Sequence, residues 1–274
     1  MSLVTKEIEF SENHLSKVAN LLKMVFKSKH LTLDYLKWLY LENPNGKVVG
    51  FDAFDGDILA AHYATIPITC IYKEKEVKAL LSLNTVTGPN YRGKGLFTSL
   101  AEKTYELAKT KGYEIVLGVA NINSTYGFVN KLGFELVEQL EARIGRLKYT
   151  MPKKDEFSFS VNRTNEFLDW RFKRPMATYF KVDNTLYTKA NQYVSAYLWK
   201  DENNLISSSK GKKSSIILWI GSKKSAQGLE GVNVNIPKAF RPSPLNLIFK
   251  PLTNSVKTLK TEHVNFQLID FDAY

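Results

Sequence analysis

The sequence predicts a mixed α/β fold, because strand-like and helical segments alternate along its first half after two leading helices. Three observations support this class. Apolar residues recur at a helical period near the N-terminus, runs rich in β-branched and aromatic residues follow between turn signals, and a glycine-rich corner joins one run to the next helix. The expected order after the leading helices is β-β-β-α-β-α-β, which places a βαβ crossover at the corner of a mixed sheet.

The leading helices and first strands are predicted from apolar spacing and turn residues. Residues 8–27 place apolar side chains one helical turn apart, and residues 33–41 form a second helix that ends before the turn Asn43-Pro-Asn-Gly46. Asp55-Gly-Asp57 is typical of a hairpin connection. The predicted strands cover residues 48–54, 58–67, 69–72 and 77–87.

The rest of the first half follows the corner. A helix is predicted over residues 96–111, and Gly112 suits its C-terminal end. The remaining elements are a strand over residues 114–119, a short helix over 124–132 and a strand over 134–147.

The second half contains an echo of the first. Residues 33–44 and 165–175 share the order aromatic-Leu-x-Trp-x-aromatic followed by proline. This match indicates an internal repeat, and two unrelated amphipathic helices with a buried Trp are the other interpretation. Later strand-like runs cover residues 178–182, 187–198, 215–220 and 245–249, without a second glycine corner. We expect one domain over residues 1–150 and a second, smaller one over residues 151–274.

The segment Thr85–Thr98 carries the strongest functional signal, because it leads from a strand through two glycines into a helix. The first N–H groups of a helix have no partner within it and lie at its positive end, which suits a phosphate or pyrophosphate. Gly93 and Gly95 lack Cβ, so the backbone can take left-handed angles and a ligand can approach closely. Arg92 and Lys94 add positive charge to the same corner.

The run Arg92-Gly-Lys-Gly-Leu-Phe97 resembles the signature of the GNAT superfamily of acetyl-coenzyme A-dependent N-acetyltransferases. That signature is Arg or Gln, two residues, Gly, one residue, then Gly or Ala, so Phe97 departs from it. The downstream segment 121–134 closes with Lys-Leu-Gly-Phe, as in the family. The resemblance covers about residues 1–147 and implies a GNAT acyltransferase fold, followed by a degenerate second GNAT-like half.

The resemblance also implies a cofactor site. The backbone from Arg92 to Thr98 would hold the pyrophosphate of acetyl-CoA, a free strand edge would pair with its pantetheine arm, and residues near the next helix would meet the thiol end. The implied contacts are Thr85, Val86, Thr87, Arg92, Gly93, Lys94, Gly95, Leu96, Phe97, Thr98, Asn121 and Ser124.

Acetyl transfer to an amine requires a neutral amine, a donor for the developing oxyanion and a proton for the leaving thiolate. Where many family members place the acidic Tyr, this chain has Val129; Tyr126, one helical turn earlier, is the implied acid, and a packing Tyr is the alternative. His62, Tyr63 and Asn84 are expected to line the acceptor side, although a lone His on an apolar strand is often a core residue.

The chain end offers further candidates for holding an amine. Asp270 and Asp272 lie near the C-terminal Tyr274, where carboxylates are otherwise simply solvated. The layout, with a Trp-containing second helix and a degenerate second half, is similar to tandem family members, some of which acetylate aminoglycosides. An amino sugar is therefore the expected acceptor.

Composition and charge narrow the function classes. The net charge is +11, mostly from the second half, but the lysines lie scattered around turns without interleaved aromatics, so we expect no nucleic-acid partner. No apolar run suits a membrane span, and the four histidines and single Cys70 favour neither a metal site nor a disulfide. We expect a cytoplasmic protein of unknown oligomeric state.

The sequence therefore predicts an acetyl-CoA-dependent N-acetyltransferase that acts on a small amine. A catalytically weak or inactive CoA-binding regulatory module is the alternative, which the residues at positions 97 and 129 favour.

Overall fold

The computed structural model describes residues 3–153, 156–201, 209–237, 240–241 and 243–271. The helices are α1 (Glu12–Phe26), α2 (Leu33–Leu41), α3 (Leu96–Thr110), α4 (Ile122–Tyr126) and α5 (Asn165–Phe172). The strands of the first half are β1 (Val4–Glu7), β2 (Val49–Asp55), β3 (Ile58–Tyr72), β4 (Lys75–Thr87), β5 (Ile115–Ala120), β6 (Glu135–Gln139) and β7 (Glu141–Tyr149). Those of the second half are β8 (Phe159–Val161), β9 (Tyr179–Val182), β10 (Thr185–Lys189), β11 (Val194–Lys200), β12 (Ser209–Lys210), β13 (Ile216–Gly221), β14 (Leu229–Asn235), β15 (Asn246–Pro251) and β16 (Val264–Asn265).

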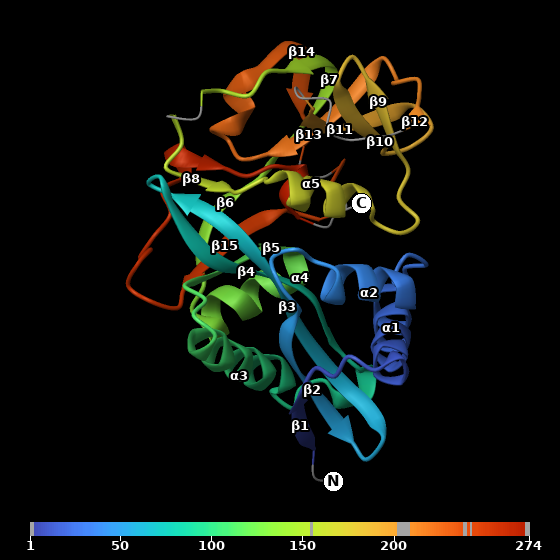
Figure 1. Ribbon diagram of the computed structural model, residues 1–274, viewed down its shortest axis with the longest axis vertical. Helices are drawn as coiled ribbons and strands as arrows, with labels where there is room; N and C mark the ends of the chain where they lie inside the picture. The colour runs from blue at the N-terminus through green and yellow to red at the C-terminus, as the bar shows by residue number, and fades with distance from the viewer. Residues whose placement is uncertain (1–2, 154–155, 202–208, 238–239, 242, 272–274) are drawn as a thin grey trace.

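These strands form two mixed sheets, one below the other in Figure 1, so the predicted α/β class is confirmed. The first sheet has the order β1-β2-β3-β4-β5-β15-β6, with β8 joining β3 to β16. The second sheet has the order β12-β9-β10-β11-β13-β7-β14.

The leading helices follow local signals. Helix α2 has the predicted bounds, because the Thr32 side chain caps its first turn by accepting a hydrogen bond from the Tyr35 N–H. Helix α1 begins later than predicted, at Glu12, because the Ser11 side chain caps it. The short strand β1, which was not predicted, ends at Glu7. The strand was missed because four residues carry too little periodicity to be recognised.

The two strands predicted over 58–67 and 69–72 are one continuous strand, β3, despite the proline between them. Pro67 has no N–H to donate, but β2 ends its pairing with β3 at Thr65, and β8 joins only from Cys70 onward. The proline therefore occupies a gap on one edge of the strand, where no ladder hydrogen bond is lost.

The single strand predicted over 134–147 is wrong. The chain forms β6 and β7, which separate at Leu140 and enter different sheets. The run predicted over 187–198 is likewise two strands, β10 and β11, because Asn191 makes a turn by accepting from the N–H groups of Tyr193 and Val194. Strand β14 was missed because Gly and Asn interrupt its apolar pattern.

The two sheets share one strand order. In the first, β2, β3 and β4 are antiparallel neighbours, β5 is parallel to β4, and β15 then β6 follow antiparallel. In the second, β9, β10, β11, β13, β7 and β14 follow with the same directions. Helix α5 precedes β9 as α2 precedes β2, which favours the internal repeat.

Each half lends one strand to the other. Strand β15, from the second half, lies between β5 and β6, and β7, from the first half, lies between β13 and β14. The division of the chain at residue 150 stays a prediction, and this exchange joins its two parts through continuous hydrogen-bond ladders.

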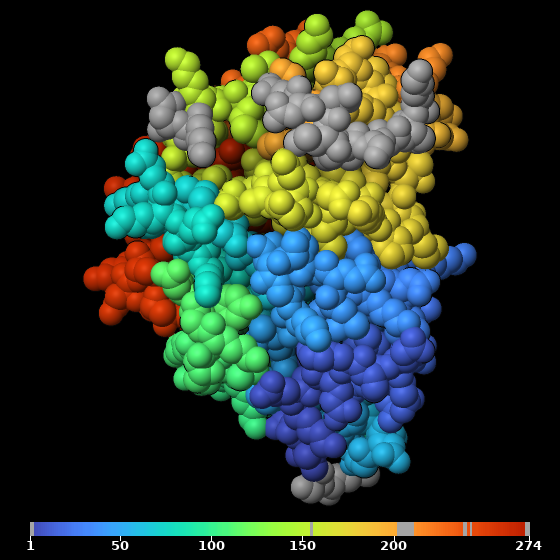
Figure 2. All heavy atoms as spheres, viewed as in Figure 1, coloured from blue at the N-terminus to red at the C-terminus, as the bar shows by residue number. Residues whose placement is uncertain are grey.

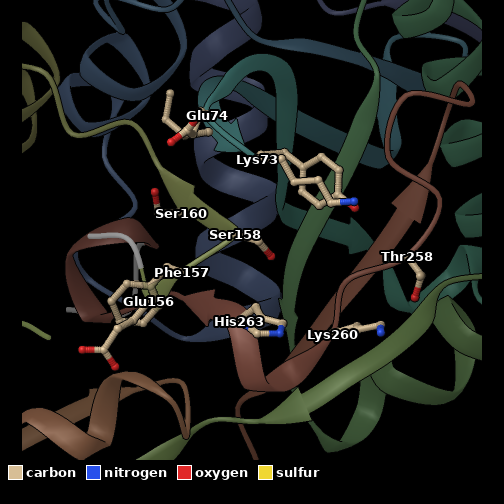
Figure 3. A pocket seen from close by; sticks show the side chains of 11 residues that line it. Lys73, Glu74, Glu156, Phe157, Ser158, Ser160, Thr258, Lys260 and His263 are labelled. Carbon is tan, nitrogen blue, oxygen red and sulfur yellow. The ribbon is translucent and has the colours of Figure 1, made fainter. Parts of the chain in front are cut away.

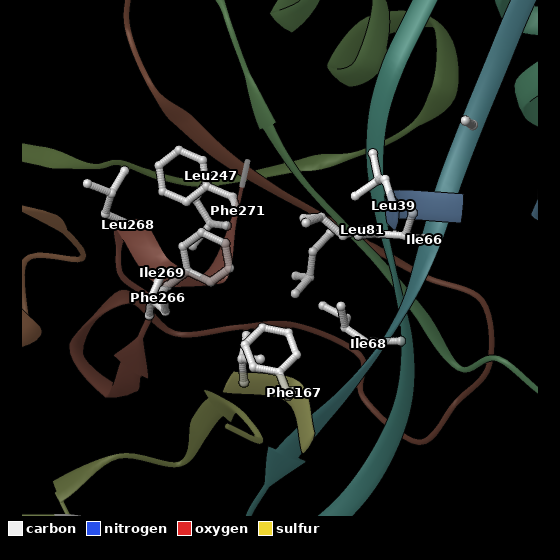
Figure 4. Close-up of a cluster of buried hydrophobic side chains, with 14 of the residues drawn as sticks. Leu39, Ile66, Ile68, Leu81, Phe167, Leu247, Phe266, Leu268, Ile269 and Phe271 are labelled. Atoms are coloured by element: carbon white, nitrogen blue, oxygen red, sulfur yellow. The ribbon is translucent and has the colours of Figure 1, made fainter. Parts of the chain in front are cut away.

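Helices α1 and α2 cover one face of the first sheet, and α3 covers the other (Figure 1). The largest core continues across both halves. Figure 4 shows Leu39 of α2, Ile68 of β3, Phe167 of α5, Leu247 of β15 and Phe271 of the C-terminal segment gathered in it. The same core therefore supports both sheets. None of the described helices is long and apolar enough to cross a membrane.

Candidate functional site

The glycine corner has the geometry of an anion site. Gly93 and Gly95 both have left-handed backbone angles, with φ values of 77° and 73°, so the predicted need for glycine is met. Gly95 is the N-cap of α3 but has no side chain to bond the helix start. The first helical hydrogen bond runs from the Ser99 N–H to the Gly95 carbonyl oxygen at 3.0 Å, so the preceding N–H groups of the helix remain available to a ligand.

Tyr91 connects the glycine corner to the β2–β3 hairpin. The Tyr91 hydroxyl donates to Asp55 at the β2–β3 hairpin, with 3.0 Å between the oxygens. The Lys94 ammonium lies over the Tyr91 ring, 5.1 Å from its centre, and Arg92 is exposed beside it. The positive charge is therefore placed next to the helix start without an acidic partner of its own among the described residues.

Strands β4 and β5 diverge beside this corner. Their parallel pairing ends at Ser82 and Gly118, so the β5-facing edge of β4 has no strand partner from residue 83 to 87. This is the segment expected to pair with pantetheine, and it holds Thr85, Val86 and Thr87. The Thr85 hydroxyl is buried and has no hydrogen-bond partner within the described ranges. A free strand edge and an unpaired polar atom suit an extended, amide-bearing ligand such as pantetheine.

A β-bulge in β4 places one extra residue opposite β3. Val86 pairs with His62 and Leu83 pairs with Ala64, so three steps on β4 oppose two on β3. Asn84, inside the bulge, has a left-handed φ of 50°, a conformation that Asn tolerates better than most residues. The bulge turns the Asn84 side chain toward α2, where its amide nitrogen lies 3.1 Å from the Tyr40 hydroxyl.

The departure of Phe97 from the family signature has a packing explanation. Its ring meets the Phe128 ring edge-on at 5.2 Å and the Tyr63 ring at 6.1 Å. A Cβ on Gly127 would lie 2.9 Å from the Phe97 ring, so Gly127 provides the space that the larger side chain needs. Phe97 therefore belongs to the core beneath the corner and leaves the helix start open.

Helix α4 follows β5 and carries the other predicted residues. Asn121 caps it by accepting from the N–H groups of Asn123 and Ser124, while the Ser124 hydroxyl accepts from the Asn121 N–H at 3.1 Å. Both side chains thus shape the helix start, and their contact with coenzyme A stays a prediction. The Tyr126 side chain is 66% exposed. A bound thiolate could therefore reach it, as a proton donor requires. Val129 is half-buried in the π-helical turn Gly127–Lys131.

His62 and Tyr63 are completely buried, so neither presents an atom to the surface. The Tyr63 hydroxyl lies 2.9 Å from the Ser82 hydroxyl and 2.5 Å from that of Tyr105. His62 lies between Tyr40 and Asp52, at 2.9 and 2.6 Å. A contact of either predicted side chain with substrate stays a prediction.

A cavity of about 710 Å³ lies where the two halves meet, and Asn84 lines it. From the first half come Phe26, Ser28, His30, Leu31 and Tyr35; from the second come Arg174, Pro175, Met176, Ala177, Thr178, Thr188, Lys189 and Ala190. Figure 2 shows the yellow second-half segment directly against the blue surface of α1 and α2. Because Asn84 leads into the free edge of β4, this cavity adjoins the predicted cofactor site.

A second cavity, of about 840 Å³, lies at the other end of β3 and β4. Figure 3 shows Lys73 at its hairpin turn, with Lys260 and His263 opposite. Its lining mixes bases with the acids Glu74 and Glu156. Since the turn between Tyr72 and Lys75 is the opposite strand end from Asn84, this cavity is remote from the corner.

Of the two C-terminal acids expected to hold an amine, the structure describes only Asp270. Asp270 is buried and binds Arg163 through both carboxylate oxygens, at 2.7 and 2.5 Å. It therefore anchors the chain end instead of facing an amine. Asp272 and Tyr274 lie outside the described residues.

Sequence reasoning missed Tyr40, Asp52 and His14. Tyr40 contacts Asn84 directly, and His62 connects Tyr40 to Asp52 and then to His14. Their only sequence signal is a set of polar residues on otherwise apolar segments. They lie on three different elements, and only the folded sheet brings them together.

Comparisons with known proteins concern the sequence and the fold. The family model described as an acetyltransferase (GNAT) domain matches residues 8–137. An uncharacterised N-acetyltransferase of Methanocaldococcus jannaschii is 28% identical over 151 residues, which cover 51% of this chain and 61% of that protein. The chain thus spans less than two thirds of this relative.

Two solved structures are similar over both halves. A GCN5-related N-acetyltransferase from Anabaena variabilis has a TM-score of 0.61 at 12% identity, over 91% of this chain and 73% of its own. A probable N-acyltransferase of unknown function from Enterococcus faecalis has a TM-score of 0.59 at 10% identity, over 92% and 73%. At these identities the likeness concerns the fold. Residues 8–137 are thus similar to a GNAT acetyltransferase domain, and the chain has the GNAT acyltransferase fold.

Proposed function

We propose that this protein is an acetyl-CoA-dependent N-acetyltransferase that acts on a small primary amine. The observation that carries the proposal is the pairing of an open helix start at Gly95 with the unpartnered edge of β4. The open helix start suits a diphosphate, and the unpartnered strand edge suits an extended chain with two amides.

The described residues around the corner suit coenzyme A. The backbone N–H groups of Leu96, Phe97 and Thr98 would hold the pyrophosphate, and Arg92 and Lys94 would offset its charge. The edge from Thr85 to Thr87 would bond pantetheine. When bound, acetyl-CoA supplies the thioester whose acetyl group is transferred.

The acceptor amine would occupy the cavity of about 710 Å³ beside Asn84. Its lining includes the aromatic rings of Phe26 and Tyr35 and the hydroxyl groups of Thr178 and Thr188. Rings pack against the C–H faces of sugars and hydroxyls bond their oxygens, so an amino sugar fits this lining.

Proton transfer to the leaving thiolate is assigned to Tyr126. Its hydroxyl is exposed at the end of α4, next to the diverging strands. An acid that must reach a bound sulfur cannot be locked in the core, as Tyr63 is. The single Cys70 is buried and free, and burial raises the pKa of its thiol, which fits a reducing, cytoplasmic compartment.

Two measurements on the purified protein test the proposal. The first is the thermal shift produced by acetyl-CoA, with adenosine as a control that lacks the pyrophosphate. The second is thiol release with glucosamine as acceptor, against glucose, which lacks the amine. A shift together with amine-dependent thiol release supports the enzyme. A shift without thiol release for a wide set of amines supports the inactive CoA-binding alternative, and the absence of any shift overturns both.

A further inference from the structure

A chain of buried hydrogen bonds leads from the acceptor cavity into the core. The Asn84 amide nitrogen lies 3.1 Å from the Tyr40 hydroxyl, and this hydroxyl lies 2.9 Å from His62 Nε2. His62 Nδ1 lies 2.6 Å from Asp52 Oδ1, and the other oxygen of Asp52 lies 2.8 Å from His14 Nε2. The residues come from β4, α2, β3, β2 and α1, so the chain crosses most of the first half.

The direction of these bonds is set at Asp52. Burial alone would raise the pKa of this carboxyl group, but the flanking imidazoles of His62 and His14 lower it below its ordinary value. Asp52 is therefore ionised and can only accept hydrogen bonds. His62 must donate its Nδ1–H to it, and in the neutral ring Nε2 is then an acceptor.

Tyr40 continues the same direction. Its side chain is completely buried, and burial raises the pKa of its phenol far above the ordinary value, so the hydroxyl keeps its proton. With a neutral His62 ring, it donates that proton to His62 Nε2. Its oxygen is left to accept, and the Asn84 amide N–H is the donor that it meets. Each donor along the chain thus faces an acceptor.

The consequence appears at Asn84. An amide whose NH₂ group is held by Tyr40 must turn its carbonyl oxygen the other way. In the described part of the chain no hydrogen bond uses Asn84 Oδ1, and Asn84 is half-buried in the wall of the cavity of about 710 Å³. In the flipped orientation of the amide, the NH₂ group would point toward the cavity. Asn84 Oδ1 would then face the Tyr40 hydroxyl oxygen, which is itself an acceptor.

We propose that Asn84 Oδ1 accepts a hydrogen bond from the substrate's primary amine, and that Tyr40, His62, Asp52 and His14 are positioning residues that hold this oxygen toward the cavity. The assignment rests on the proposed acetyltransferase function. A neutral amide oxygen accepts one N–H of the amine and leaves the nitrogen lone pair available to attack the thioester. It offers nothing to a group that lacks an N–H or O–H donor.

A double-mutant cycle separates positioning from simple stability. N84G keeps the left-handed backbone and removes the oxygen, whereas Y40F keeps the oxygen and releases the amide. We expect Y40F to raise the KM for glucosamine about fivefold and N84G about twentyfold. Acetyl-CoA thermal shifts should stay unchanged. The double variant should match N84G alone, because Tyr40 has nothing left to orient. If the KM of the double variant rises by the product of the two single effects, the proposal is overturned. Y105F, which removes a buried phenol on the other face of the sheet, is the control.

A second measurement does not depend on turnover. Nuclear magnetic resonance of the Asn84 side-chain NH₂ group should show one proton protected from exchange, with protection lost in Y40F and kept in Y105F. Glucosamine should shift this signal. A shift without acetylation leaves the proposal standing while the enzymatic function fails. Acetylation without a shift overturns the proposal alone, and the absence of both overturns both.

Discussion

Trp38 and Trp170 bond each other reciprocally across the junction of the two halves. The indole N–H of Trp38 donates to the Trp170 carbonyl oxygen at 2.8 Å, and that of Trp170 donates to the Trp38 carbonyl oxygen at 3.0 Å. Their rings stack at 4.8 Å, with 15° between the planes. These residues occupy the same place in the two similar segments of the sequence, and each makes the same contact with the other.

Replacing either Trp by Phe should destabilise the protein by about 2 kcal/mol, because a buried carbonyl oxygen loses its donor and the stacked area shrinks. The double variant should lose less than the sum of the single losses, since both changes break the same contact. Urea unfolding measures these differences. Trp219 is the matched control: it is fully buried, but its indole N–H has no partner among the described residues. W219F should therefore cost about 1 kcal/mol less than W38F, and equal losses would contradict the importance of the reciprocal bonds.

At the glycine corner, G93A should weaken acetyl-CoA binding about tenfold, because it disturbs the backbone donors that face the pyrophosphate. Gly112, at the other end of α3, has a φ of 79° against 77° for Gly93, and a Cβ at either position meets nothing within 4 Å. Both substitutions should thus cost about 1 kcal/mol of stability through the backbone alone. Calorimetric titration should show weakened binding in G93A and not in G112A. Equal affinities for the two variants would place the pyrophosphate elsewhere.

Local signals made much of the first half predictable. The Thr32 cap and the turn after residue 42 determine α2, and the glycines determine the corner. The limits of prediction lie where partners distant in sequence decide. Leu140 separates β6 from β7 because β15 and β13, more than 70 residues later, pair with them in different sheets. No local pattern around Leu140 carries this information.

The candidate site also has a part that local sequence predicts and a part that only the fold brings together. The corner and the free edge of β4 are continuous in sequence, so their motif could be recognised in one segment. The acceptor cavity combines loops of both halves, and the order of the strands alone brings them together. His62 was expected on the acceptor side because a histidine on an apolar strand attracts notice. Its buried partners Asp52 and Tyr40 lie on other elements and give no comparable signal.

D52N should lower stability by about 3 kcal/mol at pH 7, because it removes the charge that two buried imidazoles contact. The pKa of Asp52 is lowered in the folded protein, so its contribution is present above the unfolded pKa of about 3.9 and is lost as the pH falls through the folded value. The difference between wild type and D52N should therefore shrink below about pH 4. Urea midpoints between pH 7 and 3 measure it, with D57N in the exposed hairpin as the control. A constant difference over this range would mean that the charge of Asp52 contributes nothing.

Glu138 of β6 should make the protein less stable as the pH rises. Burial raises the pKa of its carboxyl group to about 7, from an ordinary value of 4.5, even though Oε2 accepts from the Lys223 N–H at 3.0 Å. Its other oxygen is buried without a partner in the described residues. A raised folded pKa gives stability that is complete below about pH 4.5 and lost as the pH passes through about 7.

E138Q removes this titration, because an amide stays neutral at every pH tested. The variant should unfold at a higher urea concentration than wild type at pH 8, and the gap should narrow toward pH 5 as Glu138 becomes protonated. E135Q, on the same strand but exposed, should follow the wild-type profile. If the urea midpoints of wild type and E138Q changed in parallel with pH, Glu138 would be ionised in the fold at no cost. Water would then have to reach its buried oxygen.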